Sequence, residues 1–506
     1  MTSSGMILYG PRGEEISTPA TRRMSAMQRQ QESVRARLDV AQTNDENRAH
    51  WGQADYLGPN AELNAATRRV IRSRARYECA NNGYAAGLVR TLANDTIGTG
   101  PSIVVTDKRF TKDEINEFES AFWEWGLSVD MGAKLRRMRL AKARDGETFA
   151  QIFSNPRAQT DVQFDFQPFE ADFVASTSID NPLFSLLDGL IIDDDGNVIA
   201  YNVLRNHPGE AMGVTIAGES DLIPARYILH LFHSDRPGQY RGCPEILSSL
   251  PLWAQLRRFT LAVLNCAESA ALPSWVMKTQ QSPSDMVFGD SMDTLQTKRG
   301  MGMVLPAGYD IGQMKAEQPT ATYGQFKREI VTEAARGCGA GVPYGVAAGD
   351  FSSYNYSSGR LDNRGYYKTT KVERSQWEVK ACTPLARGWW DEARRITGVL
   401  PEKFRNIFPR HEWRWDGDEH VDPTKEIDAA VSRVSWGFAS ADDEVNRLGS
   451  DRDTVWRKNA AALGLTEDEY AKRMADKYFG AQVKSSSQDT PEAPPSNPYN
   501  GGGSNG

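Results

Sequence analysis

The sequence contains few cysteines and no long hydrophobic run. Five cysteines are spread over 506 residues without a CxxC pair. This odd, unclustered set favours neither a disulfide framework nor a structural zinc site, so we expect reduced thiols. No segment approaches the roughly 20 apolar residues that span a bilayer, and the polar start MTSSGMILYGPRGEE lacks the basic-then-apolar order of a signal peptide. We therefore expect a soluble, folded protein without a membrane partner.

The compact motifs of common enzymes are also missing. GxxxxGK[ST] is absent, and the glycines of GCGAGVPYG (Gly337–Gly345) come without the lysine that reaches a phosphate. Neither GxSxG nor HExxH occurs, and the six histidines are scattered without a nucleophile beside them. We expect no catalysis and no cofactor. A metal-dependent enzyme built from dispersed acids stays open as an alternative, because such acids converge only in the fold.

Two clusters of metal-type side chains do not favour a metal site. His230 and His233, near Asp235, lie three residues apart in a strand-like run, which puts the histidines on opposite faces of a strand. A second cluster holds the acids Asp416, Asp418, Glu419 and Asp422. It lacks the EF-hand order of alternating acids, glycine and a distal glutamate, and Asp422 with Pro423 suits a helix start instead. We predict no metal.

The hydrophobic pattern indicates an α+β fold. Residues 1–60 are polar and rich in Gln, Arg and Asn, which is typical of an arm that orders only on assembly. Residues 61–242 mix helical patterns with strand-like runs such as ETFAQIF and NVIAYNVL, separated by turn signals such as Asp195-Gly196. With 40% hydrophobic residues, the chain can bury sizeable cores.

Two long helices flank a small insert. Between Pro251 and Leu272 apolar residues recur at spacings of three and four, which predicts a helix roughly 33 Å long at 1.5 Å per residue. Strand-like SWVMK and GMVLPAGYDI lie in the insert, and a second helix starts near Thr320 and ends among glycines at 337–341. Such helices can hold the insert far from the body, or they can pack as a hairpin into one globule.

The segment Gly341–Arg360, GVPYGVAAGDFSSYNYSSGR, lacks hydrophobic periodicity. Pro343 stops the preceding helix, Gly345 and Gly349 free the backbone, and the Ser and Asn side chains can hydrogen bond to their own backbone. We therefore predict a presented loop, a kind of segment that often carries function.

Two groups of basic residues stand out in this acidic chain, whose formal charge is −7. The first is Arg68, Arg69, Arg72, Arg74 and Arg76. It could contact a nucleic acid or an acidic neighbour, but a solvated helix face paired with Glu62 and Glu78 is favoured. The second is Arg360, Arg364, Lys368 and Lys371. Steps of four, four and three put this second group on one helix face, suited to salt bridges between subunits, which we favour, or to phosphate contacts.

Ordered blocks of the sequence resemble the lambda family of phage portal proteins. The family signature Asp-aromatic-Ser followed by Asn-Tyr-Ser-Ser-x-Arg is similar to DFSSYNYSSGR (Asp350–Arg360). Further similar blocks follow in the family's order: Arg72–Ile103, Arg144–Phe153, Asp195–Gly209, His230–Leu250 and Trp413–Ala430. The resemblance thus extends over most of the chain.

The resemblance implies a portal fold with named parts. In chain order these are a flexible N-terminal arm (1–60), an α+β wing (61–242), a first stem helix (243–273), a small β clip (274–318), a second stem helix (319–341), a tunnel loop (342–359), a long helix that returns to the wing (360–412), a helical C-terminal crown (413–483) and a disordered tail (484–506).

The resemblance also implies a function. Twelve copies would form a ring at one capsid vertex of a tailed phage, through which the terminase packages double-stranded DNA that is later ejected. The expected partners are further copies of the chain, the terminase large subunit, major capsid and scaffold proteins, head-completion or tail connector proteins, and DNA without sequence specificity. The ring would assemble in the bacterial cytoplasm and remain in the virion. Because its subunits are acidic, the ring is expected to let DNA slide through and not to bind the DNA backbone tightly.

The tunnel loop would face the DNA channel. The residues that the resemblance assigns to it are Asp350, Phe351, Ser352, Ser353, Tyr354, Asn355, Tyr356, Ser357 and Ser358. Its aromatic side chains could press on a duplex or pack against the neighbouring subunit's loop. Two alternatives to a portal are a lower-order head-tail adaptor ring and a metal-dependent DNA-processing enzyme that uses acids such as Asp416 and Asp418.

Overall fold

The computed structural model describes residues 49–175, 185–210, 219–271, 275–279, 309–313, 322–339, 341–352, 354–417 and 423–486. The chain divides into two units, residues 1–62 and 63–506. The described part of the first unit contains one short helix, α2 (Pro59–Glu62). A search of the described ranges finds no helix that is long and apolar enough to cross a membrane. Most of the expected arm and nearly all of the expected tail lie outside the described residues.

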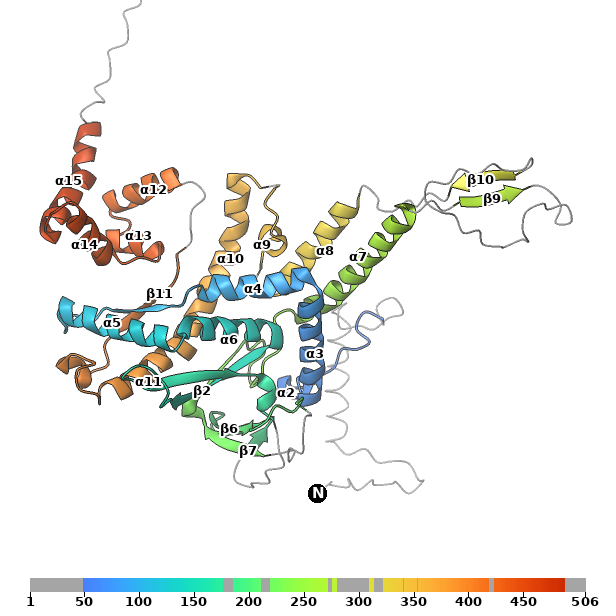
Figure 1. Ribbon diagram of the computed structural model, residues 1–506, viewed down its shortest axis with the longest axis horizontal. Coiled ribbons are helices and arrows are strands. Elements are labelled where there is room, and N and C mark those ends of the chain that lie inside the picture. Colours follow the sequence, from blue (N-terminus) through green and yellow to red (C-terminus); the bar gives the residue numbers. More distant parts are fainter. Residues whose placement is uncertain are drawn as a thin grey trace, which may run out of the picture. The chain divides into compact units, whose positions relative to one another are not determined.

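The second unit opens with a run of helices (Figure 1). They are α3 (Ala65–Asn81), α4 (Gly83–Ile97), α5 (Lys112–Ser128) and α6 (Met131–Asp145). Asn82 separates α3 from α4, because its extended backbone ends the first helix while its side chain accepts hydrogen bonds from the N–H groups of Tyr84 and Ala85. Thr111 and Glu114 form a capping box that starts α5.

Short antiparallel sheets complete the body. Strand β2 (Glu147–Ser154) lies between β3 (Phe164–Phe169) and β8 (Ile228–Phe232). A second sheet joins, in chain order, β4 (Ser185–Leu187), β5 (Leu190–Ile192), β6 (Val198–Leu204) and β7 (Ser220–Pro224). Asp188 and Gly189 have φ values of 50° and 85°, the left-handed conformation that the two-residue turn between β4 and β5 requires. Helices and antiparallel sheets together agree with the predicted α+β class.

A third pairing joins distant parts of the chain. Strand β1 (Ser102–Val105) pairs with β11 (His411–Arg414). It lies over the largest core, where the aromatic side chains of α5 meet those of α11 (Thr383–Ala393). Phe118 contacts Trp389 edge to face at a centroid distance of 5.4 Å and stacks on Phe404 at 4.6 Å. This core therefore ties the middle of the chain to its N-terminal helices.

Helix α11 continues a longer helix through a π-turn. Helix α10 (Tyr356–Trp377) runs into the π-helix η6 (Glu378–Cys382) and then into α11. Pro384 has no N–H to donate to the carbonyl of Lys380, and its ring would clash with that carbonyl in a regular helix. The chain widens locally, and the N–H of Thr383 donates to the carbonyl of Glu378, five residues earlier.

The two long helices around the insert agree closely with the sequence prediction. Helix α7 spans Leu250–Ala271 and α8 spans Tyr323–Gly337, and the two pack side by side (Figure 1). Phe259 of α7 lies 5.2 Å from Phe326 of α8, measured between ring centroids. Between the helices, β9 (Trp275–Thr279) pairs with β10 (Tyr309–Gln313), while the rest of the expected clip lies outside the described residues.

Four helices make up the C-terminal region: α12 (Pro423–Ser435), α13 (Ala441–Arg447), α14 (Arg452–Ala462) and α15 (Glu467–Ser486). Ser440 and Asp443 form the capping box that starts α13. The ammonium group of Lys112 on α5 lies 2.9 Å from Asp453 and 3.2 Å from Glu467. These ion pairs connect the C-terminal helices to α5.

A buried carboxylate, that of Glu147, organises the interior of the body. Its oxygens accept hydrogen bonds from Arg241 at 2.7 and 2.8 Å and from Arg72 at 3.2 Å, and His230 Nε2 lies 3.2 Å away. Burial opposes ionisation of Glu147, but the charge of Arg241 and the contact with His230 hold its pKa well below the ordinary value. Burial also lowers the pKa of His230, and its Nδ1 lies 3.3 Å from the Tyr201 hydroxyl.

The first basic group of the sequence is therefore split in two. Arg68 pairs with Asp188 at 2.8 Å, and Arg76 pairs with Asp145 at 2.9 Å. With Arg72 these side chains lie at i, i+4 and i+8 on the inner face of α3, while Arg69 and Arg74 are exposed. Both interpretations of the sequence put all five arginines outside, which was wrong for the buried Arg68 and Arg72, while Arg76 is half-buried. Arg68 and Arg72 are therefore not available to a nucleic acid.

Glu119 on α5 is a second carboxyl group whose pKa is shifted by the protein. Its Oε1 accepts a hydrogen bond from the Val105 N–H at 2.7 Å. Burial, with the charge of Asp451 nearby, raises the pKa of Glu119 to about 7, although Arg414 acts in the opposite direction. The folded chain therefore binds this proton more tightly than the unfolded chain does.

We predict that Glu147→Gln lowers the free energy of unfolding by about 3–5 kcal/mol, because it leaves buried arginine charge without its partner. Glu219→Gln serves as a matched control, since Glu219 pairs with Arg205 on the exposed surface at 3.3 Å and its loss should change stability little. Urea unfolding followed by circular dichroism measures both. Equal effects of the two changes would contradict the central role of Glu147.

We predict that Glu119→Gln changes the pH dependence of stability. Because the folded pKa of Glu119 is raised, the wild-type chain loses stability as pH rises from the ordinary glutamate value to about 7. The variant avoids this loss while keeping an acceptor for Val105, so it should match the wild type near pH 4 and exceed it near pH 8 by an amount on the order of 3 kcal/mol. Urea midpoints across that range test this, and a gap independent of pH would contradict it.

Candidate functional site

The predicted loop is shorter in the structure than the range 342–359. Helix α9 (Tyr344–Ala348) occupies its first part, and α10 begins at Tyr356. Pro343 stands at the N-cap position of α9, and Gly349 ends this helix with a left-handed φ of 66°. Val342 and Ala347 are buried, which anchors the base of the loop. The irregular part is confined to the residues between Gly349 and Tyr356.

Two aromatic residues fold back over α9. The Tyr354 hydroxyl accepts a hydrogen bond from the Gly345 N–H at 3.1 Å, and the Phe351 and Tyr354 ring centroids lie 5.9 Å apart. A Cβ at Gly345 would lie 2.9 Å from both rings, so this close approach needs glycine. Phe351 remains 55% exposed. The loop is thus a compact turn that presents the Phe351 side chain to solvent.

Several polar residues of the loop stabilise its own backbone. The Asp350 carboxylate accepts from the Ser352 hydroxyl at 2.6 Å and from the Ser352 N–H at 3.0 Å, and these bonds lower the pKa of Asp350. Asn355 and Ser358 form a capping box at the start of α10, with hydrogen bonds of 2.9 and 3.1 Å. Ser353 lies outside the described residues, as do the side chains of Tyr356 and Ser357.

The four basic residues predicted to share a face do lie on one helix. They are Arg360, Arg364, Lys368 and Lys371, and all are exposed on α10. Among the residues that the structure describes, none of the four forms an ion pair. Leu361 and Val372, 70% and 56% exposed, lie beside them. We call these six residues the basic face of α10.

The inner side of α10 holds a buried charge cluster. Glu373 pairs with the ammonium group of Lys142 and accepts from the Trp377 indole N–H at 2.9 Å. Burial disfavours its charge, but Arg139 and Lys142 outweigh this and lower the pKa of Glu373. Arg139 also pairs with Glu245 through two hydrogen bonds of 3.0 Å. The cluster fixes α10 to α6 and to the start of α7.

Arg374 joins α10 to the end of α4. Its guanidinium donates to the carbonyls of Thr96 at 3.0 Å, Asp95 at 2.9 Å and Asp416 at 3.2 Å. The Asp416 carboxylate accepts from the Thr99 N–H at 2.6 Å and from its hydroxyl at 2.7 Å. Asp416, one member of the predicted acidic cluster, therefore binds the backbone just after the C-terminal end of α4. Asp418, Glu419 and Asp422 lie outside the described residues.

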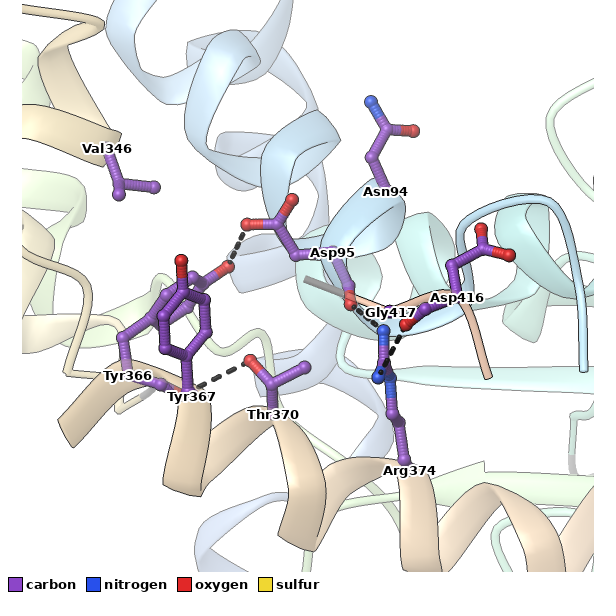
Figure 2. Close-up of a pocket in the computed structure, with 9 residues that line it drawn as sticks. All are labelled: Asn94, Asp95, Val346, Tyr366, Tyr367, Thr370, Arg374, Asp416 and Gly417. Carbon is purple, nitrogen blue, oxygen red and sulfur yellow. Dashed lines mark hydrogen bonds between the residues drawn. The ribbon is translucent and has the colours of Figure 1, made fainter. Parts of the chain in front are cut away.

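These contacts surround a pocket of about 260 Å³ beside α10, which Figure 2 shows. Its lining comes from α4, α9, α10 and the segment after β11: Asn94, Asp95, Val346, Tyr366, Tyr367, Thr370, Arg374, Asp416 and Gly417. The Asp95 carboxylate accepts from the Tyr366 hydroxyl at 2.7 Å (Figure 2). With two carboxylates and one guanidinium, the lining carries a net negative charge.

Sequence reasoning did not identify the pocket or the inner cluster. Tyr366, Glu373 and Trp377 recur at helical spacing opposite the basic face, which is the pattern of a buried helix face. That signal was available in the sequence. The partners on α4 and after β11 were not, because they come from segments far apart in the chain.

The other candidate clusters do not form a new site. His230 is buried beside Glu147, and the exposed His233 lies 3.5 Å from Asp235, so the two histidines are not brought together. Glu170, Asp172 and His207 have ligand atoms within 4.8 Å of one another. The Arg76 guanidinium already lies 2.8 Å from Asp172 and 3.3 Å from Glu170. Two members of this trio are therefore already partners of the half-buried Arg76.

Comparisons with known proteins agree on one family. The family described as phage portal protein, lambda family, matches residues 44–374, more than half of the chain. A probable portal protein of Halomonas phage phiHAP-1 is 26% identical over 420 residues, covering 77% of this chain and 79% of that protein.

Solved structures of gene transfer agent particles are also similar. A chain of the native virion aligns with a TM-score of 0.46 and 15% identity, covering 74% of this chain and 92% of that chain. A chain of the neck of the empty particle aligns with a TM-score of 0.45 and 16% identity, covering 76% and 91%. From the match over residues 44–374, this chain belongs to the lambda family of phage portal proteins, which are structural components of the virion and not enzymes.

Proposed function

We propose that this chain is the subunit of a portal ring at one capsid vertex of a tailed phage. Double-stranded DNA would be packaged through the ring and later ejected through it. The family match over residues 44–374 carries this proposal. The energy for packaging would come from a separate terminase, because the sequence has no GxxxxGK[ST] motif that could cradle a nucleoside triphosphate.

The parts of the fold have proposed roles within that ring. The body with its antiparallel sheets would be the wing, and α7 and α8 would be the stem. The hairpin of β9 and β10 would belong to the clip, which would bind the terminase during packaging and head-completion proteins afterwards. Helices α12 to α15 would form the crown. Twelve copies, assembled in the host cytoplasm with scaffold and major capsid proteins, would make the ring.

The turn at Phe351 is the proposed contact with DNA. It presents an exposed aromatic ring among Ser, Asn and Tyr side chains and the Asp350 carboxylate, on a base made by α9 and the capped start of α10. Such a surface can touch a duplex without reading its sequence, since base readout needs donors and acceptors placed in a groove. A conduit built from chains of charge −7 would let a polyanion slide.

We expect the purified wild-type chain to form closed rings of about twelve copies. Native mass spectrometry gives the subunit number, and negative-stain class averages show whether the hole is wide enough for a duplex. A smaller closed ring would favour the head-tail adaptor instead. A chain that stays monomeric under all assembly conditions would contradict the ring.

We predict that Phe351→Ala leaves ring assembly and thermal stability unchanged but lowers the amount of DNA retained in filled heads several-fold. The reason is that Phe351 is exposed and contributes little to the core, while it is the side chain presented at the tip. Leu222→Ala is the matched control, since Leu222 is a similarly exposed apolar residue on β7. Normal DNA retention by the Phe351 variant would refute the role of the turn.

A further inference from the structure

Among the residues that the structure describes, no acidic side chain forms an ion pair with the cations of the basic face of α10. Several buried arginines and lysines of the body form ion pairs, including Arg72, Arg139 and Lys142. In contrast, Arg360, Arg364, Lys368 and Lys371 are exposed and make no ion pair within the described ranges. The arrangement leaves four like charges along about three turns of one helix, which raises the free energy of the isolated chain slightly.

The apolar residues beside these charges favour a protein partner over DNA. Leu361 and Val372 are well exposed and sit among the cations. A DNA backbone offers phosphates and sugars and little apolar surface, so it would cover the charges and leave these side chains in water. A protein surface can cover both, because interfaces combine apolar contact with charge complementarity.

The pocket beside α10 has the complementary character. Asp95 and Asp416 give its lining a net negative charge, and Val346 with Tyr367 adds apolar surface. One water molecule takes up about 30 Å³. A pocket of about 260 Å³ therefore has room for one long side chain.

The basic face and the pocket lie on neighbouring sides of α10. At about 100° per residue, the average direction of the pocket-lining residues of α10 is roughly 100° around the helix from that of Arg360, Arg364, Lys368 and Lys371, with Tyr367 at the edge between them. The two surfaces therefore look in different directions. When two different surfaces of one chain bind each other, the contact is head to tail, and repeated contacts of this kind close into a ring.

We infer that the basic face of α10 binds a second copy of the chain, with Arg364 or Lys368 of one subunit inserted into the pocket at Asp95 and Asp416 of the next. This inference rests on the proposed ring and names one of its subunit contacts. It assigns the basic face to assembly and leaves DNA contact to the turn at Phe351.

The test uses charge reversal and rescue in the full-length chain. Arg364→Glu with Lys368→Glu should lower the ring fraction at fixed concentration at least tenfold or so, because it places like charges at the contact. Asn94→Lys cancels the net negative charge of the pocket lining, and Asn94 is suitable because it is exposed and its side chain makes no hydrogen bond among the described residues. It should weaken ring formation alone and restore rings when combined with the two glutamates.

Arg69→Glu with Arg74→Glu is the matched control, because these exposed arginines on α3 give the same charge change elsewhere. Its rings should form normally, and circular dichroism should show that all variants are folded. If the Arg364 and Lys368 variant forms rings as the wild type does but retains less DNA, the basic face contacts DNA and the inference is overturned while the portal function stands. If the wild type forms no rings, the proposed ring fails together with this contact.

Discussion

The carboxylate of Glu147 is the interaction on which the body depends. It comes from the first residue of β2 and gathers Arg72 from α3, His230 from β8 and Arg241 from the segment before α7. Burying any one of these polar or charged side chains alone would cost free energy of desolvation. Their hydrogen bonds and ion pairs with Glu147 offset that cost. The position of α3 against the sheet is therefore set by charge as much as by apolar packing. Everything that α3 contacts, including α7, is placed through this interior cluster.

A related cluster places the candidate site. Glu373 and Arg374 are neighbours on α10, yet they point to different partners: Glu373 pairs with Lys142 of α6, and Arg374 closes the end of α4. Between them they hold α10 against two helices near its C-terminal end. Among the described residues, the hydrogen bonds at the N-terminal end of α10 are those of its own cap and of the turn over α9. This difference makes the turn the more adaptable end of a well-anchored helix.

Local patterns in the sequence predicted where helices lie better than they predicted which helix faces are buried and which residues they contact. The apolar spacing of Pro251–Leu272 gave α7 to within one residue, and the steps from Arg360 to Lys371 correctly placed four cations on one helix face. Helical spacing also grouped Arg68, Arg72 and Arg76, but it could not show that this face is buried, because the acids opposite it lie about 70 to 120 residues away in the chain. Because the segment around α9 is rich in Gly and Ser, its sequence indicated a loop and not this short helix. The pocket needs residues from α4, α9, α10 and the segment after β11, and no one of these segments carries a signature of it.

The π-turn at Glu378–Cys382 has a geometric consequence for the long helix that contains it. One extra residue in a turn advances the helix phase by about 100°. The rows of side chains on α10 are therefore rotated relative to those on α11. The packing of α11 around Trp389 thus does not determine which way the side chains of α10 point. Pro384 therefore sets the rotation of α10 about the helix axis relative to α11. As a result, α11 can pack its apolar residues into the core while α10 turns its charged face in a different direction.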